Sequence, residues 1–536
     1  MRKIAVIDSE TDPFRKGRIP RPFIWGYFDG IEFKTFASAA ELVAFISPMD
    51  CIIYAHNGGK FDYHFLLEYL EPFDDIKIIN GRIAVMRIGR AELRDSFNIV
   101  PVALSAYKKD EIDYAIMEAD KRDLPSNADI IRSYLRSDCV YLYELVSKFI
   151  DAFGLRLTLA GASMAEWKRI SDRPVPQTDA DFYAEISPYY FGGRVECFQS
   201  GIIETDFKVL DINSAYPYAM TFSHPYSVER ETASGYMKDA DFVKVLCNSC
   251  GAFPYRGGMI PDTEDYEETE GLEFPNDGVW REFTVTGHEY RMAKDFGLLY
   301  KSKVIESIRF AEHISFVEYV EHFYEMRNRA KAEKDEANSL FAKLFMNSLY
   351  GKFAANPERY SNYCVVPKEN AADIDGSGWN FAGELGPWVL AESELLEEEK
   401  RYYNVATGAS ITGFVRAMLF NAIHTSKGVL YCDTDSIAVE RVGASITLGS
   451  KLGQWKDEGD FDKAGIGGKK LYIFQGKRLP ATGERKNKTA SKGVRLTDKE
   501  LWEVAAGKVV QYEPEAPTFA IRKAPVFQKR NVSKTA

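Results

Sequence analysis

The sequence predicts a multidomain protein that combines α/β and α+β architecture. The first observation is length: 536 residues exceed one ordinary hydrophobic core and favour two to four domains. The second is a set of short apolar runs that end in acidic residues, which is typical of strands with functional groups at their ends. The third is a set of long segments with helical spacing of apolar residues between those runs.

Composition indicates a well-packed globular chain, with 45% hydrophobic and 13% aromatic residues. The longest apolar runs are much shorter than a membrane span. The first residues, from Met1 to Ile7, lack the apolar core of a secretory signal, so we expect a cytoplasmic protein that is not secreted. Seven scattered cysteines do not predict a disulfide framework, and the single Cys247-x-x-Cys250 pair favours structural thiols over a zinc site.

The net charge of −11 argues against a nucleic-acid partner only if charge is spread evenly. It is not: ten Lys or Arg and one acid lie between Lys463 and Arg495, and five more basic residues and no acid follow from Arg522. The sequence therefore predicts a phosphate-binding surface at the C-terminal end.

The N-terminal strand is expected at residues 2–7, with Asp8 and Glu10 on one face of its end. Further strands are expected at 23–28 and 51–54. A lone D-x-E is more often a solvated strand end than a metal site, so this pair needs partners.

Two later segments supply such partners. Asn57 precedes a Gly-Gly turn, and Phe61 and Asp62 are expected to open an amphipathic helix. Tyr134 and Asp138 share one face of a long predicted helix at 127–153. Taken alone, Tyr134 and Asp138 are explained equally well as residues on a solvent-exposed helix face. A helix with a buried face explains the aromatic residues after Asn57, but not Asp62 beside them.

The middle of the chain places a third acid at a strand end. After a predicted helix at 157–170, the Gly192-Gly193 pair predicts a turn. Asp211 closes the strand Val209-Leu210, and residues 213–216 form a turn whose backbone N–H groups can cradle a triphosphate.

From about residue 314 the chain is predicted to be helical, with Lys343, Asn347 and Tyr350 on one face. A helix at 407–424 follows. The stretch YCDTDS, residues 431–436, predicts a β-hairpin with Asp433-Thr434-Asp435 at its turn. An ordinary turn explains D-T-D equally well, but the second acid Asp211 favours a site for two divalent ions.

These motifs, in this order, resemble those of the family B DNA polymerases, specifically the compact protein-primed branch of phages and linear plasmids. The resemblance runs from Asp8 to about Gly493. The motifs that carry it are DSET at 8–11, NGGKFD at 57–62, YLRSD at 134–138, YFGGR at 190–194, DINSAY at 211–216, KLFMNSLYG at 343–351, YCDTDS at 431–436 and KLY at 470–472.

The resemblance implies a ribonuclease-H-like 3′–5′ exonuclease domain at 1–155 and a right-hand polymerase domain at 156–536. Within the latter it implies a palm at about 187–250 and 400–475, fingers at about 313–358 and a thumb at about 476–536. Two terminal-protein-region insertions are expected at about 226–312 and 359–405.

For the exonuclease, the resemblance implies two metal ions held by four carboxylates, namely Asp8, Glu10, Asp62 and Asp138. Tyr134 would orient the attacking water, and Lys109 would neutralise the scissile phosphate. The residues implied to hold the unpaired 3′ end are Asn57, Thr11 and Phe65. The family's Ser-Leu pair corresponds to Ser96-Phe97, where Phe departs from the pattern.

For the polymerase, the resemblance implies that Asp211 and Asp435 bridge two ions, with Asp433 as a supporting ligand. The residues implied to contact the incoming nucleotide are Ser214, Tyr216, Lys331, Lys343, Asn347 and Tyr350. The residues implied to contact template or primer are Tyr190, Gly192, Gly193, Arg194, Thr434, Lys470 and Tyr472. Ala215 replaces the usual Leu before Tyr216, which predicts a local packing change.

The implied cofactors are Mg²⁺, or Mn²⁺, at two ions per active site, with dNTP substrates. The implied partners are primer-template DNA, single-stranded DNA and a separate terminal protein that supplies the priming hydroxyl, and the chain itself is expected to be monomeric. A family B polymerase that uses an ordinary nucleic-acid primer is the alternative.

Overall fold

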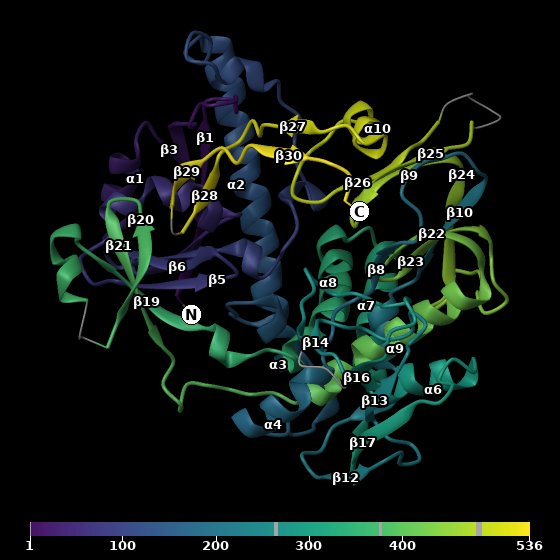
Figure 1. Ribbon diagram of the computed structural model, residues 1–536. Coiled ribbons are helices and arrows are strands. Elements are labelled where there is room, and N and C mark those ends of the chain that lie inside the picture. Colours follow the sequence, from purple (N-terminus) through teal and green to yellow (C-terminus); the bar gives the residue numbers. More distant parts are fainter. Residues whose placement is uncertain (1, 262–265, 375–377, 479–484, 522, 536) are drawn as a thin grey trace.

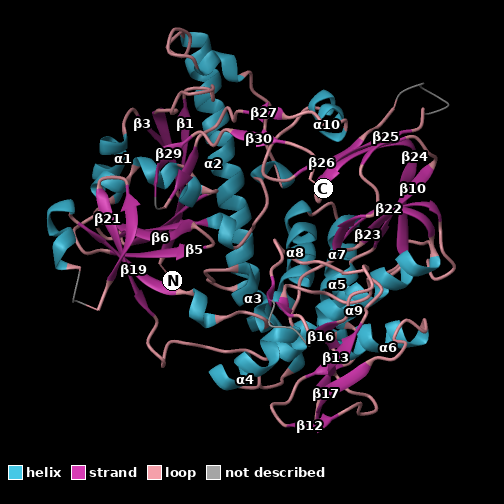
Figure 2. Cartoon of the chain, in the orientation of Figure 1, coloured by secondary structure: helices cyan, strands magenta, loops and turns pink. Residues whose placement is uncertain are grey.

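The computed structural model of the chain describes residues 2–261, 266–374, 378–478, 485–521 and 523–535. Two large sheets organise it, one built mainly from the N-terminal third and one that carries Asp211 (Figure 1). Helices gather between and below these sheets, as the colouring by secondary structure in Figure 2 shows. Residues 262–265 of the expected first insertion and 479–484 of the expected thumb lie outside the described residues.

The N-terminal sheet is mixed, because β1 and β7 each pair in parallel with β4 while the other neighbours are antiparallel. Its strands, in spatial order, are β20 (Asn380–Leu385), β21 (Trp388–Glu394), β19 (Ser361–Val366), β5 (Asp75–Ile79), β6 (Arg82–Ile88), β7 (Ala91–Asp95), β4 (Cys51–Ala55), β1 (Lys3–Thr11), β2 (Pro22–Phe28) and β3 (Phe33–Phe36).

The long helix α2 (Pro125–Phe153) lies against β1 and β2, and α1 (Ala39–Ile46) contacts β2 and β3. Gly26 permits the close approach of α2, since a Cβ there would lie 2.9 Å from Cγ of Leu135. At its other end α2 packs Phe149 and Phe153 against the second half of the molecule. One helix therefore spans both halves.

The segment after Asn57 differs from the prediction. Three short 3₁₀ helices replace the expected amphipathic helix: η1 (Gly58–Lys60), η2 (Asp62–Phe65) and η3 (Leu67–Tyr69). Asp62, Tyr63, Leu66 and Leu67 are all buried, so their side chains must find partners on more than one side of the segment. A helix with a single apolar face does not achieve this.

The second sheet is antiparallel throughout, and the predicted hairpin at 431–436 is confirmed as its β22–β23 turn. Its strands, in spatial order, are β26 (Lys488–Ser491), β25 (Leu471–Gly476), β24 (Trp455–Gly468), β10 (Phe207–Ile212), β23 (Ser436–Arg441), β22 (Lys427–Asp433) and β8 (Val195–Cys197), with β9 (Gly201–Ile203) on β24.

The helices around the second sheet are α3 (Leu159–Ser171), α4 (Ala180–Ile186), α5 (Ala215–Met220), α7 (Val317–Ala332), α8 (Glu336–Phe353), α9 (Val405–Thr425) and α10 (Asp498–Ala505). Of these helices, α3, α5, α7, α8 and α9 share one large core with α2. The predicted helices near 127–153, 157–170 and 407–424 are confirmed to within a few residues. Further 3₁₀ helices are η4 (Ser96–Asn98), η5 (Leu104–Ala106), η6 (Tyr114–Met117), η7 (Ser187–Tyr189), η8 (Pro357–Arg359) and η9 (Lys368–Asp373).

The region expected to hold the first insertion forms a small sheet of its own with α6 (Gly287–Asp295) on it. The strands of this region are β12 (Arg230–Ser234), β17 (Lys303–Phe310), β13 (Phe242–Cys247) and β16 (Arg281–Thr286), with the pairs β11 (His224–Pro225)/β18 (His313–Ile314) and β14 (Gly258–Met259)/β15 (Tyr266–Glu267) beside them.

The region expected to hold the second insertion extends the N-terminal sheet, which sequence reasoning did not foresee. Strand β19 pairs with β5, and the indole of Trp388 donates a hydrogen bond to the carbonyl of Leu67 at 2.6 Å. Main-chain pairing thus fastens strands β19–β21 to the N-terminal third.

The C-terminal tail also returns to the N-terminal third (Figure 1). After β27 (Val510–Tyr512), the hairpin β28 (Thr518–Ala520) and β29 (Lys523–Val526) lies beside β20 before β30 (Arg530–Val532) pairs with β27. Phe519 packs against Phe61 and Phe65 with ring centroids 5.5 and 5.4 Å apart. Within the described residues, no helix is long and apolar enough to cross a membrane, and all seven cysteines are free.

Candidate functional site

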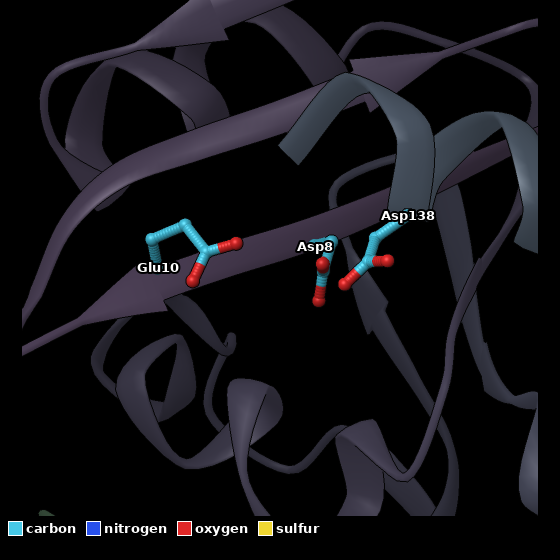
Figure 3. A group of neighbouring side chains, drawn as sticks. All are labelled: Asp8, Glu10 and Asp138. Atoms are coloured by element: carbon cyan, nitrogen blue, oxygen red, sulfur yellow. The ribbon is translucent and has the colours of Figure 1, made fainter. Parts of the chain in front are cut away.

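Three carboxylates meet at the edge of the N-terminal sheet. Asp8 and Glu10 extend from β1, and Asp138 reaches them from α2 (Figure 3). One carboxylate oxygen of each lies within 4.8 Å of the others. Oxygens at this spacing fit a hard divalent cation such as Mg²⁺. The structure therefore joins three of the predicted exonuclease residues that lie up to 130 positions apart.

The electrostatics of this cluster fit a cation as well. Burial, together with the charges of Asp138 and Asp62, raises the pKa of Glu10 to about 8, while the charge of Lys109 opposes that shift. Burial and the neighbouring carboxylates also raise the pKa of Asp8 well above its ordinary value. Buried acids that repel one another favour either protons or a metal ion.

Asp62 is not part of that three-carboxylate group, but its charge acts on both Asp8 and Glu10. Its carboxylate is 3% exposed and accepts a hydrogen bond from the hydroxyl of Ser9, and burial raises its pKa to about 6. Lys109 places its Nζ 3.8 Å from a carboxylate oxygen of Asp138. The hydroxyl of Tyr134 is 3.1 Å from that of Tyr114, a partner that sequence reasoning missed.

The residues predicted to hold a 3′ end lie around this cluster. Asn57 has a left-handed backbone with φ of 62°, and its side-chain oxygen accepts a hydrogen bond from Arg82 at 3.0 Å. Thr11 ends β1, and its hydroxyl donates to the carbonyl of Asp12. Phe65 is half-buried beneath Phe519 of the C-terminal hairpin.

A second pair of acids meets in the antiparallel sheet. Asp211 on β10 is the register partner of Ser436, and the N–H of the next residue, Ile212, donates to the carbonyl of Asp435 at 2.8 Å. Burial raises the pKa of Asp435 to about 7, with the charges of Asp211 and Asp433 adding to the shift. The hairpin thus brings residues 211 and 435 side by side, as predicted.

Asp433, predicted to be a supporting metal ligand, pairs with a lysine, and its role as a ligand stays a prediction. Both of its carboxylate oxygens accept from Nζ of Lys470, at 2.6 and 2.8 Å. Among the described residues, it belongs to no group of three or more potential ligands within 4.8 Å. Lys470, predicted to grip a primer, therefore neutralises Asp433. Its own N–H donates to the hydroxyl of Tyr431, while Tyr472 is largely buried against that ring.

The loop at 190–194 packs directly on the hairpin turn. The N–H of Thr434 donates to the carbonyl of Arg194 at 2.6 Å, and a Cβ on Gly193 would lie 2.8 Å from Cγ2 of Thr434. The side chain of Arg194 is 2% exposed, pairs with Glu196 and donates to the carbonyl of Gly251. This corrects the prediction that Arg194 contacts DNA: its side chain anchors the loop.

The predicted nucleotide contacts line the neighbouring helices. Ser214 has a left-handed backbone at the start of α5, and Ala215 is buried in the core. The rings of Tyr216 and Tyr350 stack with their centroids 4.3 Å apart. The exposed residues Lys331 and Lys343 line a cavity of about 640 Å³ between α7, α8 and residues 105–107. Asn347 donates to the carbonyl of Lys343.

Comparison with known proteins agrees with this geometry. Residues 101–380 match the family model of type B DNA polymerases, organellar and viral. The DNA-directed DNA polymerase of Enterobacteria phage PRD1 is 36% identical, over 99% of this chain and 98% of that protein. The chain belongs to the organellar and viral type B DNA polymerases.

More distant relatives give the same result for this polymerase. The DNA polymerase of Bacillus phage phi29 is 25% identical over 88% of this chain and 86% of that protein. The solved structure of the phi29 DNA polymerase with primer-template DNA and incoming nucleotide covers 99% of this chain with a TM-score of 0.73 at 19% identity. The polymerase therefore has the fold of that enzyme, as the sequence predicted.

The polymerase also contains a buried ion pair that sequence reasoning missed. Arg416 on α9 pairs with Glu289 at 2.6 Å and donates to the carbonyls of Phe191 and Gly192. Glu289 also completes the capping box of α6. No local signal marks Arg416, because Glu289, Phe191 and Gly192 all lie more than 120 positions away.

Proposed function

We propose that this polymerase copies a DNA template at Asp211 and Asp435 and removes mismatched 3′ ends at Asp8, Glu10, Asp62 and Asp138. The observation that carries the proposal is the meeting of Asp211 and Asp435 beside the stacked Tyr216–Tyr350 pair. Mg²⁺, two ions per site, or Mn²⁺ in its place, would activate the attacking oxygen and stabilise the leaving group.

In the synthetic site the chain's own residues would position the substrates. Lys343 and Lys331 would receive the β- and γ-phosphates, and Lys343 would donate a proton to the departing pyrophosphate. Tyr216 would pack where a ribose 2′-OH would otherwise sit, with Asn347 and Tyr350 bordering the new base pair. Lys470 would face the primer end, with the positive charge of its ammonium group already neutralised by the carboxylate of Asp433.

In the excision site Tyr134 would orient the attacking water, and Lys109 would offset charge on the scissile phosphate. Asn57, Thr11 and Phe65 would hold the frayed 3′ end. The raised pKa values of Glu10 and Asp62 support a role in metal-dependent excision. Carboxyl groups whose pKa lies near neutral pH bind and release a metal ion readily.

We further propose protein-primed initiation with strand displacement on a linear viral or plasmid genome. Support comes from the two additional regions: a small separate sheet at 230–310 and strands at 361–394 that extend the N-terminal sheet. A separate terminal protein would supply the first hydroxyl and form a heterodimer with the otherwise monomeric enzyme in the host cytoplasm. Ordinary nucleic-acid priming is the competing mode.

The test measures transfer of one labelled dNTP to a candidate terminal protein with Mg²⁺ and origin DNA, alongside extension of a primed template. We expect the wild type to do both, Asp435→Asn to do neither, and Asp457→Asn, a surface acid paired with Lys208, to behave as wild type. Extension without protein labelling would favour nucleic-acid priming. No extension by the wild type would refute the synthetic function.

A further inference from the structure

A chain of three hydrogen bonds runs through the protein from His288 on α6 to the helix α5. Nε2 of His288 lies 3.1 Å from Oγ of Ser410 on α9, and Nδ1 of His224 on β11 lies 2.9 Å from the same oxygen. Nε2 of His224 lies 2.7 Å from the carbonyl oxygen of Ala219. Helix α9 also contacts both α6 and α5 (Figure 2). The chain therefore ends on the helix that carries Tyr216.

The carbonyl of Ala219 determines the direction of every bond in this chain. A carbonyl only accepts, so Nε2 of His224 carries a proton and donates it. Burial lowers the pKa of His224 to about 4, so the ring is neutral at working pH and its Nδ1 accepts. The hydroxyl of Ser410 then donates to His224, and its oxygen accepts from the Nε2–H of His288. Donors and acceptors are matched at all three bonds.

The centre of the chain is shielded from water. His224 is 0% exposed and Ser410 is 2% exposed. A buried donor or acceptor that loses its partner keeps the full cost of its desolvation, so the surrounding elements shift to satisfy it. Loss of the Ser410 hydroxyl would leave both histidines with an unmatched ring nitrogen, and we expect the shift to reach the end of α5.

Aromatic rings hold the same end of α5. The ring of Phe414 on α9 lies 5.2 Å from that of His288, measured between centroids. It also lies 4.5 Å from the ring of Phe222 and 6.2 Å from that of Tyr218. Tyr218 belongs to α5, and Phe222 follows shortly after its last residue. Helices α6 and α9 therefore hold this end of α5 by both polar and aromatic contacts.

The short length of α5 makes its position sensitive to these contacts. The helix is six residues long, and Ala219 follows Tyr216 by about one helical turn. A shift at the carbonyl of Ala219 therefore moves the turn that carries Tyr216. The ring of Tyr216 stacks on that of Tyr350 with 4.3 Å between centroids, so even a small shift changes where it can lie.

We propose that His224 and Ser410 are positioning residues for nucleotide selection: through the carbonyl of Ala219 they hold α5 where the ring of Tyr216 admits a dNTP and excludes a ribonucleotide. Both residues act through α5 and not on the substrate. The chain also makes α6 of the small sheet part of the same support, because His288 donates its first bond. The inference rests on the proposed synthetic function, in which Tyr216 packs where a ribose 2′-OH would otherwise sit.

The test measures single-turnover incorporation of a dNTP and of the matching rNTP on one primed template, which gives a rate constant and a nucleotide Kd for each. In Ser410→Ala we expect discrimination against the rNTP to fall about tenfold. The change should appear in the nucleotide Kd values and not in the maximal rate for the dNTP, because Asp211 and Asp435 stay in place. Affinity for the primed template, measured by fluorescence anisotropy, should stay unchanged.

Thr407→Val is the matched control for lost stability. Thr407 lies on α9, is buried, and donates to the carbonyl of Pro225, the residue after His224. This variant loses a buried bond between α9 and β11 without breaking the chain to Ala219. The melting temperature should fall in both Thr407→Val and Ser410→Ala, but discrimination should fall only in Ser410→Ala.

Two substitutions of His224 test the last bond of the chain. The amide of His224→Gln offers a donor that reaches the carbonyl of Ala219 and an acceptor for Ser410, and this variant should keep most of the discrimination. His224→Asn is one methylene shorter, does not reach Ala219, and should lose discrimination about as Ser410→Ala does. This pair decides the matter if Ser410→Ala does not fold.

Three outcomes would overturn the inference. Wild-type discrimination in both Ser410→Ala and His224→Asn would show that the chain only stabilises the fold. Equal loss of discrimination in Thr407→Val and Ser410→Ala would indicate general loosening of α9. Equal loss in His224→Gln and His224→Asn would show that the bond to Ala219 is not what matters. Failure of the proposed function reads out separately, because the wild type would then not extend the primer at all.

Discussion

The rings of Tyr216 and Tyr350 stack face to face, with 4.3 Å between centroids and 9° between planes. Tyr216 lies on α5, directly after the strand that carries Asp211, and Tyr350 lies on α8, which carries Lys343. The stack therefore connects the element that presents Asp211, the proposed catalytic acid, with the element that presents Lys343, the proposed phosphate-binding cation. Because Tyr216 is also largely buried, burial raises its pKa to about 12, and it stays a neutral phenol at working pH.

Replacing Tyr216 by Val should weaken discrimination against ribonucleotides by about 10- to 200-fold, the range that a change in pocket volume gives. The reason is that the ring occupies space that a 2′-OH would need. The measurement is single-nucleotide incorporation of a dNTP against the matching rNTP. Tyr350→Phe keeps the stacked ring and should retain discrimination. Equal discrimination in Tyr216→Val and the wild type would contradict the assignment.

Replacing Gly193 by Ala should lower primer extension about tenfold, because the new Cβ would lie 2.8 Å from Cγ2 of Thr434 and displace the hairpin turn. Excision of single-stranded DNA should stay near wild type. Gly192→Ala is the matched control, since a Cβ there meets nothing within 4 Å. Loss of both activities in Gly193→Ala, or equal loss in both variants, would indicate a general folding defect instead.

The excision cluster predicts a pH-dependent effect of Mg²⁺ on stability. The pKa values of Glu10 and Asp62 are raised to about 8 and about 6, above their ordinary values of 4.5 and 3.8. The stabilisation that a raised pKa gives the metal-free fold is complete below the unfolded pKa and is lost as pH rises through the folded pKa. The metal-free protein should therefore become less stable between about pH 4 and pH 8.

Mg²⁺ should raise the melting temperature more at pH 8 than at pH 6, because protons compete with the ion at the lower pH. Thermal unfolding with and without Mg²⁺ measures this. The pH-dependent part of the increase should shrink in Asp8→Asn/Asp138→Asn, which removes two of the clustered charges. An increase that is equal at both pH values would be inconsistent with metal binding at these acids.

Replacing Phe519 by Ala should release the β28–β29 hairpin from the N-terminal third. The ring is 6% exposed and contacts Phe61, His64 and Phe65, so truncation removes about 3–5 kcal/mol of packing. We expect faster proteolysis of the tail and a raised KM for single-stranded DNA in excision, because Phe65 loses its support.

Phe381→Ala is the control for that experiment, since Phe381 is 60% exposed on the neighbouring β20. It should leave the proteolysis rate and KM unchanged. A tail that stays protease-resistant in Phe519→Ala would show that β29 and Ile521 suffice to hold it.

Local sequence determined the positions of several strands and most of the long helices in this protein, together with the acids at the ends of β1 and β10. Local patterns of apolar, charged and aromatic residues identified α2, α3, α8 and α9, and the D-T-D turn of the β22–β23 hairpin follows from turn chemistry within six residues. The order of the motifs also determined the family, because each motif depends only on residues that are neighbours in the chain.

Only the tertiary structure decided which of these groups work together. In the folded chain Asp8 and Glu10 lie close to Asp138, and Asp433 forms an ion pair with Lys470. The side chain of Arg194 is buried, and the ring of Phe519 packs against that of Phe65. It also fused strands β19–β21 to the N-terminal sheet and paired Arg416 with Glu289. The physical reason is that burial and electrostatic pairing depend on distance in space. Periodicity and turn chemistry report only on residues a few positions apart along the chain.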